Sequence, residues 1–329
     1  MRKLKPSLQV AACALLLTLT CNLRAADAKL WKTFCDDARK AANQRNFQEA
    51  TQFAGMAVAA AEQFGETDAR LVETLILAAS IQQERKAFNE AEPHLRRAFA
   101  LREAKLGTNH LSVAEIAYHL GRNLTEQKKP MEAEPLLRRA EHICKWKNGA
   151  YHPTVGVCQA ALAKSCSLAG RHDEADKLYT AALRILGAPR TTTTFTGPNE
   201  LQDNVFVPNY RRVMQIRLEH AQTLHAAKRY KEAEESLKKL VKLIEDREGK
   251  DSGLLINPLL ALSLHYTELK QHPVAEGLLL RREQIITKHV GPKHPEHLVT
   301  MAARERLYRE QGKLVEADQL ARQIAEAAK

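Results

Sequence analysis

The sequence predicts an all-α protein, a solenoid of about seven helix-turn-helix repeats. Three observations support this prediction. The segment Ala87–Ala98 recurs 42 residues later as Lys129–Ala140, with eight of twelve residues identical. Apolar residues in and around both copies fall at helical spacing. Aromatic residues make up only 5% of the chain, which favours close packing of helices through small side chains over a core built around large rings.

The repeat extends along most of the chain. Its marker is an alanine that usually follows a glutamate, and successive markers are separated by 41, 42, 42, 58, 42 and 42 residues. The long step is a normal one plus 16 inserted residues. Such a near-constant spacing indicates a solenoid. The seven marker alanines are Ala50, Ala91, Ala133, Ala175, Ala233, Ala275 and Ala317.

Each unit is predicted to contain two helices, one on each side of the marker alanine. In the third unit these are Ser112–Gln127 and Glu132–Ile143, both with apolar residues at helical spacing. Pro93 and Pro135 fall in the first turn of the second helix, where an amide has no intrahelical acceptor to lose. The prolines are therefore compatible with that helix, and the alanine lets the two helices approach closely.

These units resemble the tetratricopeptide family, in particular the 42-residue units of kinesin light chains. Leu120-Gly121, Ala133 and Ala140 match the family pattern, whereas Arg282 and Arg304-Glu305 depart from it and predict a poorer fit of the last two hairpins. The resemblance implies a right-handed superhelix that binds proteins or peptides on a concave face. The turns between units resemble Leu-Gly-x-x-His-Pro at Leu106–Ala114, Asn148–Gly156 and Val290–Leu298.

The N-terminus is predicted to be a secretory signal peptide, residues 1–28. A basic start precedes an apolar run, Leu8–Cys21, and Ala26–Ala28 is a small-x-small cleavage site. The run is shorter than the roughly 20 residues that a membrane-spanning helix needs. We therefore expect an exported protein, periplasmic or extracellular, without a stable membrane span, whose repeats occupy residues 29–329.

The remaining chain contains four cysteines and one insert. Cys144 and Cys158 flank a predicted turn and are the candidate disulfide pair, although buried thiols fit the sequence equally well. The insert, about residues 187–209, is rich in threonine and proline and is predicted to be a loop. It is interpreted first as a surface excursion and second as a lid anchored by Phe195 and Phe206.

No enzyme, cofactor site or metal site is predicted. The sequence lacks the nucleotide-binding glycine motifs, the nucleophile elbow GxSxG and the zinc motif HExxH. His289, His294 and His297 have a spacing that could suit zinc, but His294 belongs to the turn between units, which favours a structural role. The glycosylation sequence at Asn123 lies within a predicted helix.

Pairs of basic residues on the second helices raise the alternative of nucleic-acid binding, in a chain of formal net charge +11. Glutamates four residues before these cations predict i,i+4 ion pairs on a solvated outer face instead. We therefore expect no nucleic-acid partner. The basic pairs are Arg96-Arg97, Arg138-Arg139, Lys238-Lys239 and Arg281-Arg282.

The resemblance places the binding surface on the first helix of each unit. The position eleven residues before the marker is basic in four of seven units, and Arg122 and Lys164 hold it in adjacent units. Two such cations can hold a carboxylate of an extended or acidic segment of a partner protein. A solvated wall is the alternative interpretation. The predicted peptide-binding groove consists of Arg39, Tyr118, His119, Arg122, Lys164, Gln222 and Arg306.

Two further functions stay open at this stage. The array could be a structural element of an envelope complex that self-associates through its basic surface and its last helix. It could also assist a catalytic partner through the insert. The sequence itself favours the non-enzymatic scaffold.

Overall fold

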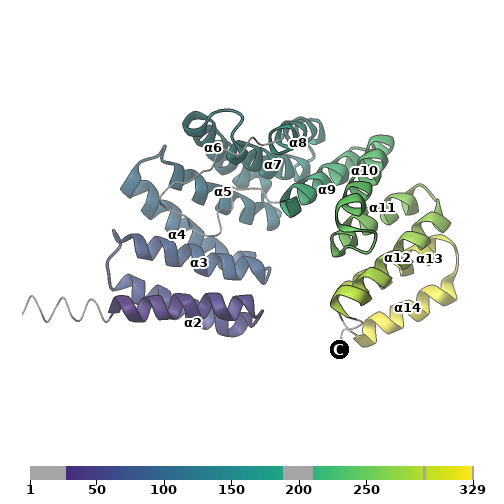
Figure 1. Ribbon diagram of the computed structural model, residues 1–329, viewed down its shortest axis with the longest axis horizontal. Helices are drawn as coiled ribbons and strands as arrows, with labels where there is room; N and C mark the ends of the chain where they lie inside the picture. The colour runs from purple at the N-terminus through teal and green to yellow at the C-terminus, as the bar shows by residue number, and fades with distance from the viewer. Residues whose placement is uncertain (1–26, 188–209, 292–293, 328–329) are drawn as a thin grey trace, which may run out of the picture. The chain divides into compact units, whose positions relative to one another are not determined.

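The computed structural model describes residues 27–187, 210–291 and 294–327. These residues form fourteen α-helices and one short 3-10 helix, with no strand among them. Consecutive helices pair into seven hairpins (Figure 1), so the all-α class and the seven helix-turn-helix repeats are confirmed. Hairpins 1 to 7 are 27–43 with α2 (Phe47–Glu62), α3 (Ala69–Glu84) with α4 (Phe88–Leu106), α5 (Leu111–Glu126) with α6 (Pro130–Asn148), α7 (Pro153–Leu168) with α8 (His172–Leu186), α9 (Tyr210–Ala226) with α10 (Tyr230–Glu248), α11 (Ile256–Glu268) with α12 (His272–Val290), and α13 (Glu296–Glu310) with α14 (Leu314–Ala327).

The chain divides into two compact units, one up to Lys147 and one from Asn148 onward. Unit 1 contains hairpins 1 to 3. Unit 2 contains hairpins 4 to 7 and the 3-10 helix η1 (Gly253–Leu255). Within each unit, helices that follow one another in sequence pack side by side (Figure 1). Residues 1–26 of the predicted signal peptide and nearly all of the insert, with Phe195 and Phe206, lie outside the described residues, so the signal peptide and the lid stay predictions.

The marker alanines form the centre of each hairpin, and all seven are fully buried. The helices α5 and α6 approach each other closely at Gly121. A methyl group on Gly121 would lie 2.6 Å from Leu137 Cγ and 3.2 Å from the carbonyl oxygen of Ala133. The glycine therefore lets the backbones of the two helices approach more closely than any other residue would allow.

Every hairpin turn contains one residue in the left-handed conformation, five residues before the marker alanine. Five of these seven residues carry a side chain, for example Lys86 with φ 62° and Lys128 with φ 63°. The next amide closes a six-residue loop, as where Lys129 N donates to Leu124 O at 2.9 Å. This is the Schellman arrangement that ends a helix. The seven residues are Arg45, Lys86, Lys128, Gly170, Lys228, Lys270 and Gly312.

Replacing Lys86 with glycine should raise the stability of unit 1 by about 0.5–1 kcal/mol. The left-handed conformation costs an L-residue about 1–2 kcal/mol, of which the flexibility of glycine in the unfolded chain takes back a part. Urea unfolding measures the change. Lys86→Ala is the matched control, since it keeps the Cβ atom and should bring no gain. Equal stability of the two variants would contradict the argument.

Histidines lie at the start of three helices that follow turns between hairpins, namely α5, α7 and α13. The Nδ1 atom of His110 accepts a hydrogen bond from Ser112 N at 3.1 Å, and that of His294 accepts one from Glu296 N at 3.2 Å. Such side-chain acceptors satisfy amides that the helix leaves without partners. The structural role predicted for His294 is confirmed. Among the described residues, no three His, Cys, Asp or Glu side chains are grouped as a metal site would require.

Arg282 requires a correction, because it strengthens the fit of the last hairpins that it was expected to weaken. Its side chain is fully buried in α12, and it donates to the carbonyl oxygens of Ile256 and Glu296, each at 3.0 Å. It also contacts the Thr300 hydroxyl and the Glu296 carboxylate. One guanidinium therefore joins α11, α12 and α13 through its fixed fork of donors.

The cysteines Cys35, Cys144, Cys158 and Cys166 are all buried. Cys144 belongs to unit 1 and Cys158 to unit 2. A disulfide between these two residues stays a prediction. Asn123 is also buried, with 1% of its surface exposed, so its glycosylation sequence lies in the packed interior of α5.

Candidate functional site

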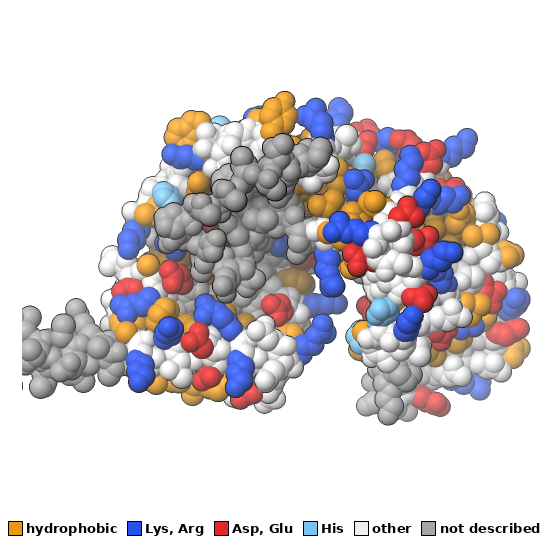
Figure 2. All heavy atoms as spheres, in the orientation of Figure 1, with side chains coloured by type: hydrophobic (Ala, Val, Ile, Leu, Met, Phe, Trp, Pro, Cys, Tyr) orange, Lys and Arg blue, Asp and Glu red, His pale blue; other side chains and the backbone are white. Residues whose placement is uncertain are grey.

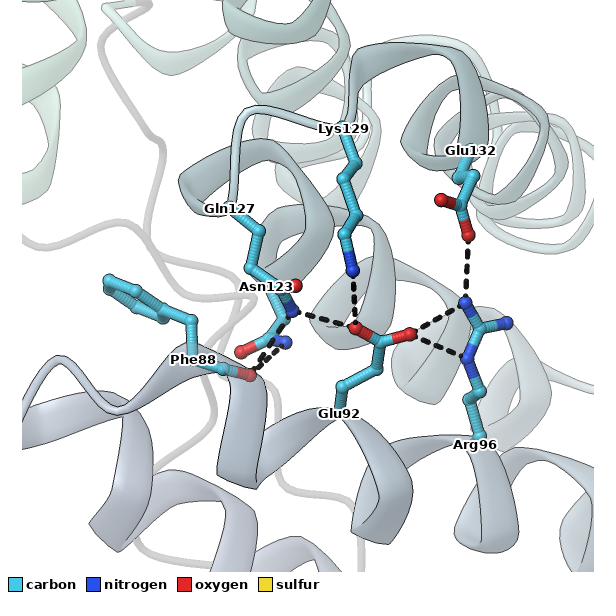
Figure 3. Close-up of polar contacts among 7 residues, drawn as sticks. All are labelled: Phe88, Glu92, Arg96, Asn123, Gln127, Lys129 and Glu132. Atoms are coloured by element: carbon cyan, nitrogen blue, oxygen red, sulfur yellow. Dashed lines mark hydrogen bonds and ion pairs between the residues drawn. The ribbon is translucent and has the colours of Figure 1, made fainter.

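In hairpins 2, 4, 5 and 6, the residue after the marker alanine is an acid that receives hydrogen bonds from the following hairpin. Glu92 in α4 shows the arrangement most fully (Figure 3). Its carboxylate accepts hydrogen bonds from Gln127 Nε2 at 2.9 Å and from Lys129 Nζ at 3.1 Å. Both donors lie in the turn between the two helices of hairpin 3. Arg96, one turn further along α4, approaches the same carboxylate at 2.7 Å and reaches Glu132 at 2.9 Å.

Backbone groups belong to the same contact. The side-chain amide groups of Asn123 and Gln127 both donate to the backbone carbonyl oxygen of Phe88, at 2.8 and 3.1 Å (Figure 3). Burial by itself raises the pKa of Glu92. Hydrogen bonds from Gln127, Arg96 and Lys129 outweigh this effect and lower the pKa to about 2. Glu92 is therefore a stable anion that joins hairpins 2 and 3.

Unit 2 repeats this contact with different donors. Asp176 in α8 lies 2.6 Å from His220 Nε2 and 2.5 Å from Arg229 Nη1 of hairpin 5. Tyr266 donates to Glu234 at 2.8 Å, and Tyr308 donates to Glu276 at 2.8 Å. Sequence reasoning missed this role, although the signal was present as an acid directly after the marker alanine in six of the seven repeat units.

The basic residues of the second helices form ion pairs with acids of the same helix and with acids of the preceding hairpin. The predicted i,i+4 pairs are present, with Arg138 at 2.7 Å from Glu134 and Lys238 at 2.6 Å from Glu234. One member of three of these pairs reaches the preceding hairpin instead, as Arg281 does to Glu245 at 2.6 Å. Figure 2 shows side chains of both charges interspersed over the described surface on the face drawn. Arg97–Glu62 and Arg139–Glu103 are the corresponding contacts of unit 1.

The predicted groove residues of unit 1 differ in exposure. Arg39 is 55% exposed and lies 3.4 Å from Asp36. Arg122 is half-buried, with its guanidinium 5.4 Å from the centre of the Tyr118 ring. Among the described residues, no carboxylate forms an ion pair with Arg122. His119 is half-buried with its edge against Tyr118.

Tyr118 requires a correction. Its side chain is fully buried, so it belongs to the core and offers no surface for a ligand. It still supports the site indirectly, because the Arg122 guanidinium lies over its ring in a cation–π contact.

The predicted groove residues of unit 2 are mostly engaged with acids of neighbouring first helices. Lys164 Nζ lies 3.7 Å from Glu219, and Arg306 lies 3.2 Å from Glu310 and 3.9 Å from Glu268. Gln222 is exposed. Arg122 and Lys164 belong to different units, so their common orientation stays a prediction.

A family profile matches part of the repeat array. The tetratricopeptide repeat profile matches residues 71–145 and 112–188. These overlapping ranges cover the second helix hairpin to the fourth. No curated protein matches the chain.

Solved structures share the fold at low sequence identity. The repeats of a putative kinesin light chain from Podospora anserina align with a TM-score of 0.52 and 21% identity, over 66% of this chain and 95% of that one. The apo form of RapI gives a TM-score of 0.62 at 11% identity, over 91% and 97%. A Rap protein complexed with competence and sporulation factor gives 0.53 at 16% identity, over 88% and 76%. No described helix is both long and apolar enough to cross a membrane.

Proposed function

We propose, because this chain carries tetratricopeptide repeats, that it is an exported, non-enzymatic scaffold which binds an extended or acidic segment of a partner protein. The binding surface would be formed by the first helices of the hairpins. The repeat fold supports a protein-interaction role, and a Rap protein of similar fold was solved in complex with competence and sporulation factor. Export to the periplasm or beyond rests on residues 1–28 alone. Self-association within an envelope complex stays the alternative.

Arg122 is the observation that carries the acidic character of the ligand. It lies half-buried on a first helix and is stacked on Tyr118, which holds its donors in place without satisfying them. A carboxylate that approaches it would form charge-assisted hydrogen bonds, worth about 1.5–3 kcal/mol each. In unit 2, by contrast, Lys164 and Arg306 already lie beside carboxylates of the protein. Arg122 is therefore the preferred anchor.

Binding of a fluorescent ten-residue glutamate peptide to the full chain tests this proposal. We expect the acidic peptide to bind more tightly than a serine-glycine peptide of equal length, with an affinity that falls as salt increases. Arg122→Ala should weaken binding about tenfold, the equivalent of about 1.4 kcal/mol, and flatten the salt dependence. Adding Lys164→Ala should weaken binding further.

The control for this experiment is Arg96→Ala. It removes the same charge from a second helix, where Arg96 is bound to Glu92 and Glu132. It should leave the affinity for the peptide within about twofold of the parent value, since it lies off the binding surface. Equal losses in the two variants would show that only net charge matters and would exclude Arg122 as the anchor.

A further inference from the structure

Two histidines meet inside unit 2, where hairpins 5 and 6 pack together. His225 near the end of α9 and His265 of α11 have ring centres 5.1 Å apart. The Tyr230 ring closes the cluster, 5.2 Å from His225 and 6.1 Å from His265. The side chain of His265 is fully buried, whereas that of His225 is 22% exposed. Neither histidine takes part in the contacts described above between hairpins.

The ring nitrogens of this pair are poorly satisfied. Among the described residues, both nitrogens of His265 and the Nε2 atom of His225 are buried without a hydrogen-bond partner. Most buried polar groups in proteins have such a partner, so each exception requires an explanation. The pair is tolerated because a neutral imidazole costs far less to bury than a charged one.

Carboxylates lie near both rings but are bound to other groups. Glu234 of α10 is 3.9 Å from His265 Nε2, yet Lys238 and Tyr266 hold it at 2.6 and 2.8 Å. Glu268 of α11 is 3.4 Å from His225 Nε2 and also 3.9 Å from Arg306 of α13. From α12, Arg282 contacts α11 at Ile256, in its first turn.

We propose that His225 and His265 form an acid-sensitive joint between hairpins 5 and 6. His225 lies beside His265, partly exposed and 3.4 Å from Glu268. A proton on His265 would create a buried cation whose nearest carboxylate, that of Glu234 at 3.9 Å, is already held by Lys238 and Tyr266. The structure accommodates that charge only if the two hairpins separate. Mild acid therefore loosens this joint.

The sign of the pH dependence follows from the burial of His265. Burial lowers the pKa of His265 below its ordinary value, and a charge on His225 lowers it further, against the opposing effects of Glu234 and Glu268. The unfolded chain thus binds more protons than the folded one below about pH 6.5, where unperturbed histidine titrates. The joint keeps its full stability above that pH and loses it as the pH falls.

Amide hydrogen exchange of the full chain at pH 7.5 and pH 5.5 tests the joint. After correction for intrinsic exchange rates, protection in α9–α11 should fall about tenfold relative to α3–α5, because an unfolded histidine is about tenfold more protonated than neutral at pH 5.5. His265→Phe keeps a ring of similar shape but cannot titrate, so it should abolish this difference. The control replaces the exposed His142 of α6 with phenylalanine (His142→Phe) and should leave the pH dependence of protection in α9–α11 as it is in the parent protein.

A second variant covers the case in which His265→Phe does not fold. His225→Gln removes the neighbouring charge and should reduce the loss of protection without abolishing it. Two results would overturn the proposal. One is equal protection of α9–α11 at both pH values in the parent protein. The other is an undiminished pH effect in whichever variant folds.

Discussion

Replacing Arg282 with alanine should lower the stability of unit 2 by about 3–5 kcal/mol, the range observed when one partner of a buried ion pair is removed. The carbonyl oxygens of Ile256 and Glu296 would lose their donor, and the space of a large, fully buried side chain would be left empty. Urea unfolding measures the loss, and amide hydrogen exchange should locate it in α11–α13. Arg282→Lys should recover only part of it, because an ammonium cannot reproduce the guanidinium fork.

Arg281→Ala is the matched control for Arg282→Ala. It removes the neighbouring guanidinium, whose side chain is 32% exposed and pairs with Glu245 on the surface. Exposed pairs of this kind contribute about 0–1 kcal/mol. Similar losses in the two variants would mean that Arg282 is an ordinary surface cation, in conflict with its burial.

Glu92→Gln should destabilise unit 1 by about 2–3 kcal/mol at neutral pH. The pKa of about 2 for this carboxyl lies below the usual glutamate value of about 4.3, and each unit of difference corresponds to about 1.4 kcal/mol. The expected loss of stability is slightly smaller than the product of these two numbers, because the carboxyl is partly exposed to solvent. The variant keeps the shape of the side chain but removes the charge that Lys129 and Arg96 contact. Thermal unfolding at pH 7 measures the difference.

The same carboxyl predicts a pH dependence. A lowered pKa means that its stabilising contribution is complete above about pH 4.3 and is lost as the pH falls toward 2. The parent protein and Glu92→Gln should therefore converge in stability over this interval. Glu90→Gln, which removes an acid 54% exposed in the same helix, is the control and should cost less than about 0.5 kcal/mol. A constant gap between Glu92→Gln and the parent down to pH 2 would refute the assignment.

The fold could be predicted because every repeat has to bury the same small side chain at the same place. Ala91, Ala133 and Ala175 are each fully buried between paired helices, and that requirement leaves a 42-residue signature in the sequence. The ends of the helices were also predictable, since prolines and turn histidines mark them. Arg282 was misjudged because its acceptors come from Ile256 and from residues of α13. Sequence spacing does not show that these groups converge on one point.

The candidate site could be predicted only in part. First helices such as α5 pack against α4 as well as α6, so most of their surface is buried and little is left for a ligand. Tyr118 was therefore expected at the surface although it is fully buried, while Arg122, one turn later on the same side of the helix, remains half-buried. The acids that engage Lys164 and Arg306 come from neighbouring helices. A single sequence reveals the charge of such residues but not the distance between them.

The contact after the marker alanine has a consequence for the segment between hairpins 4 and 5. Glu92 and Lys129 are 37 residues apart, whereas their counterparts Asp176 and Arg229 are 53 apart, a difference of 53 − 37 = 16. The additional length equals the insertion, so the extra residues leave the helical lattice undisturbed. Hairpins 4 and 5 are thus joined by their side chains rather than by a short tether. A fusion tag or a second domain could accordingly be spliced in at this point of the chain without breaking the stack.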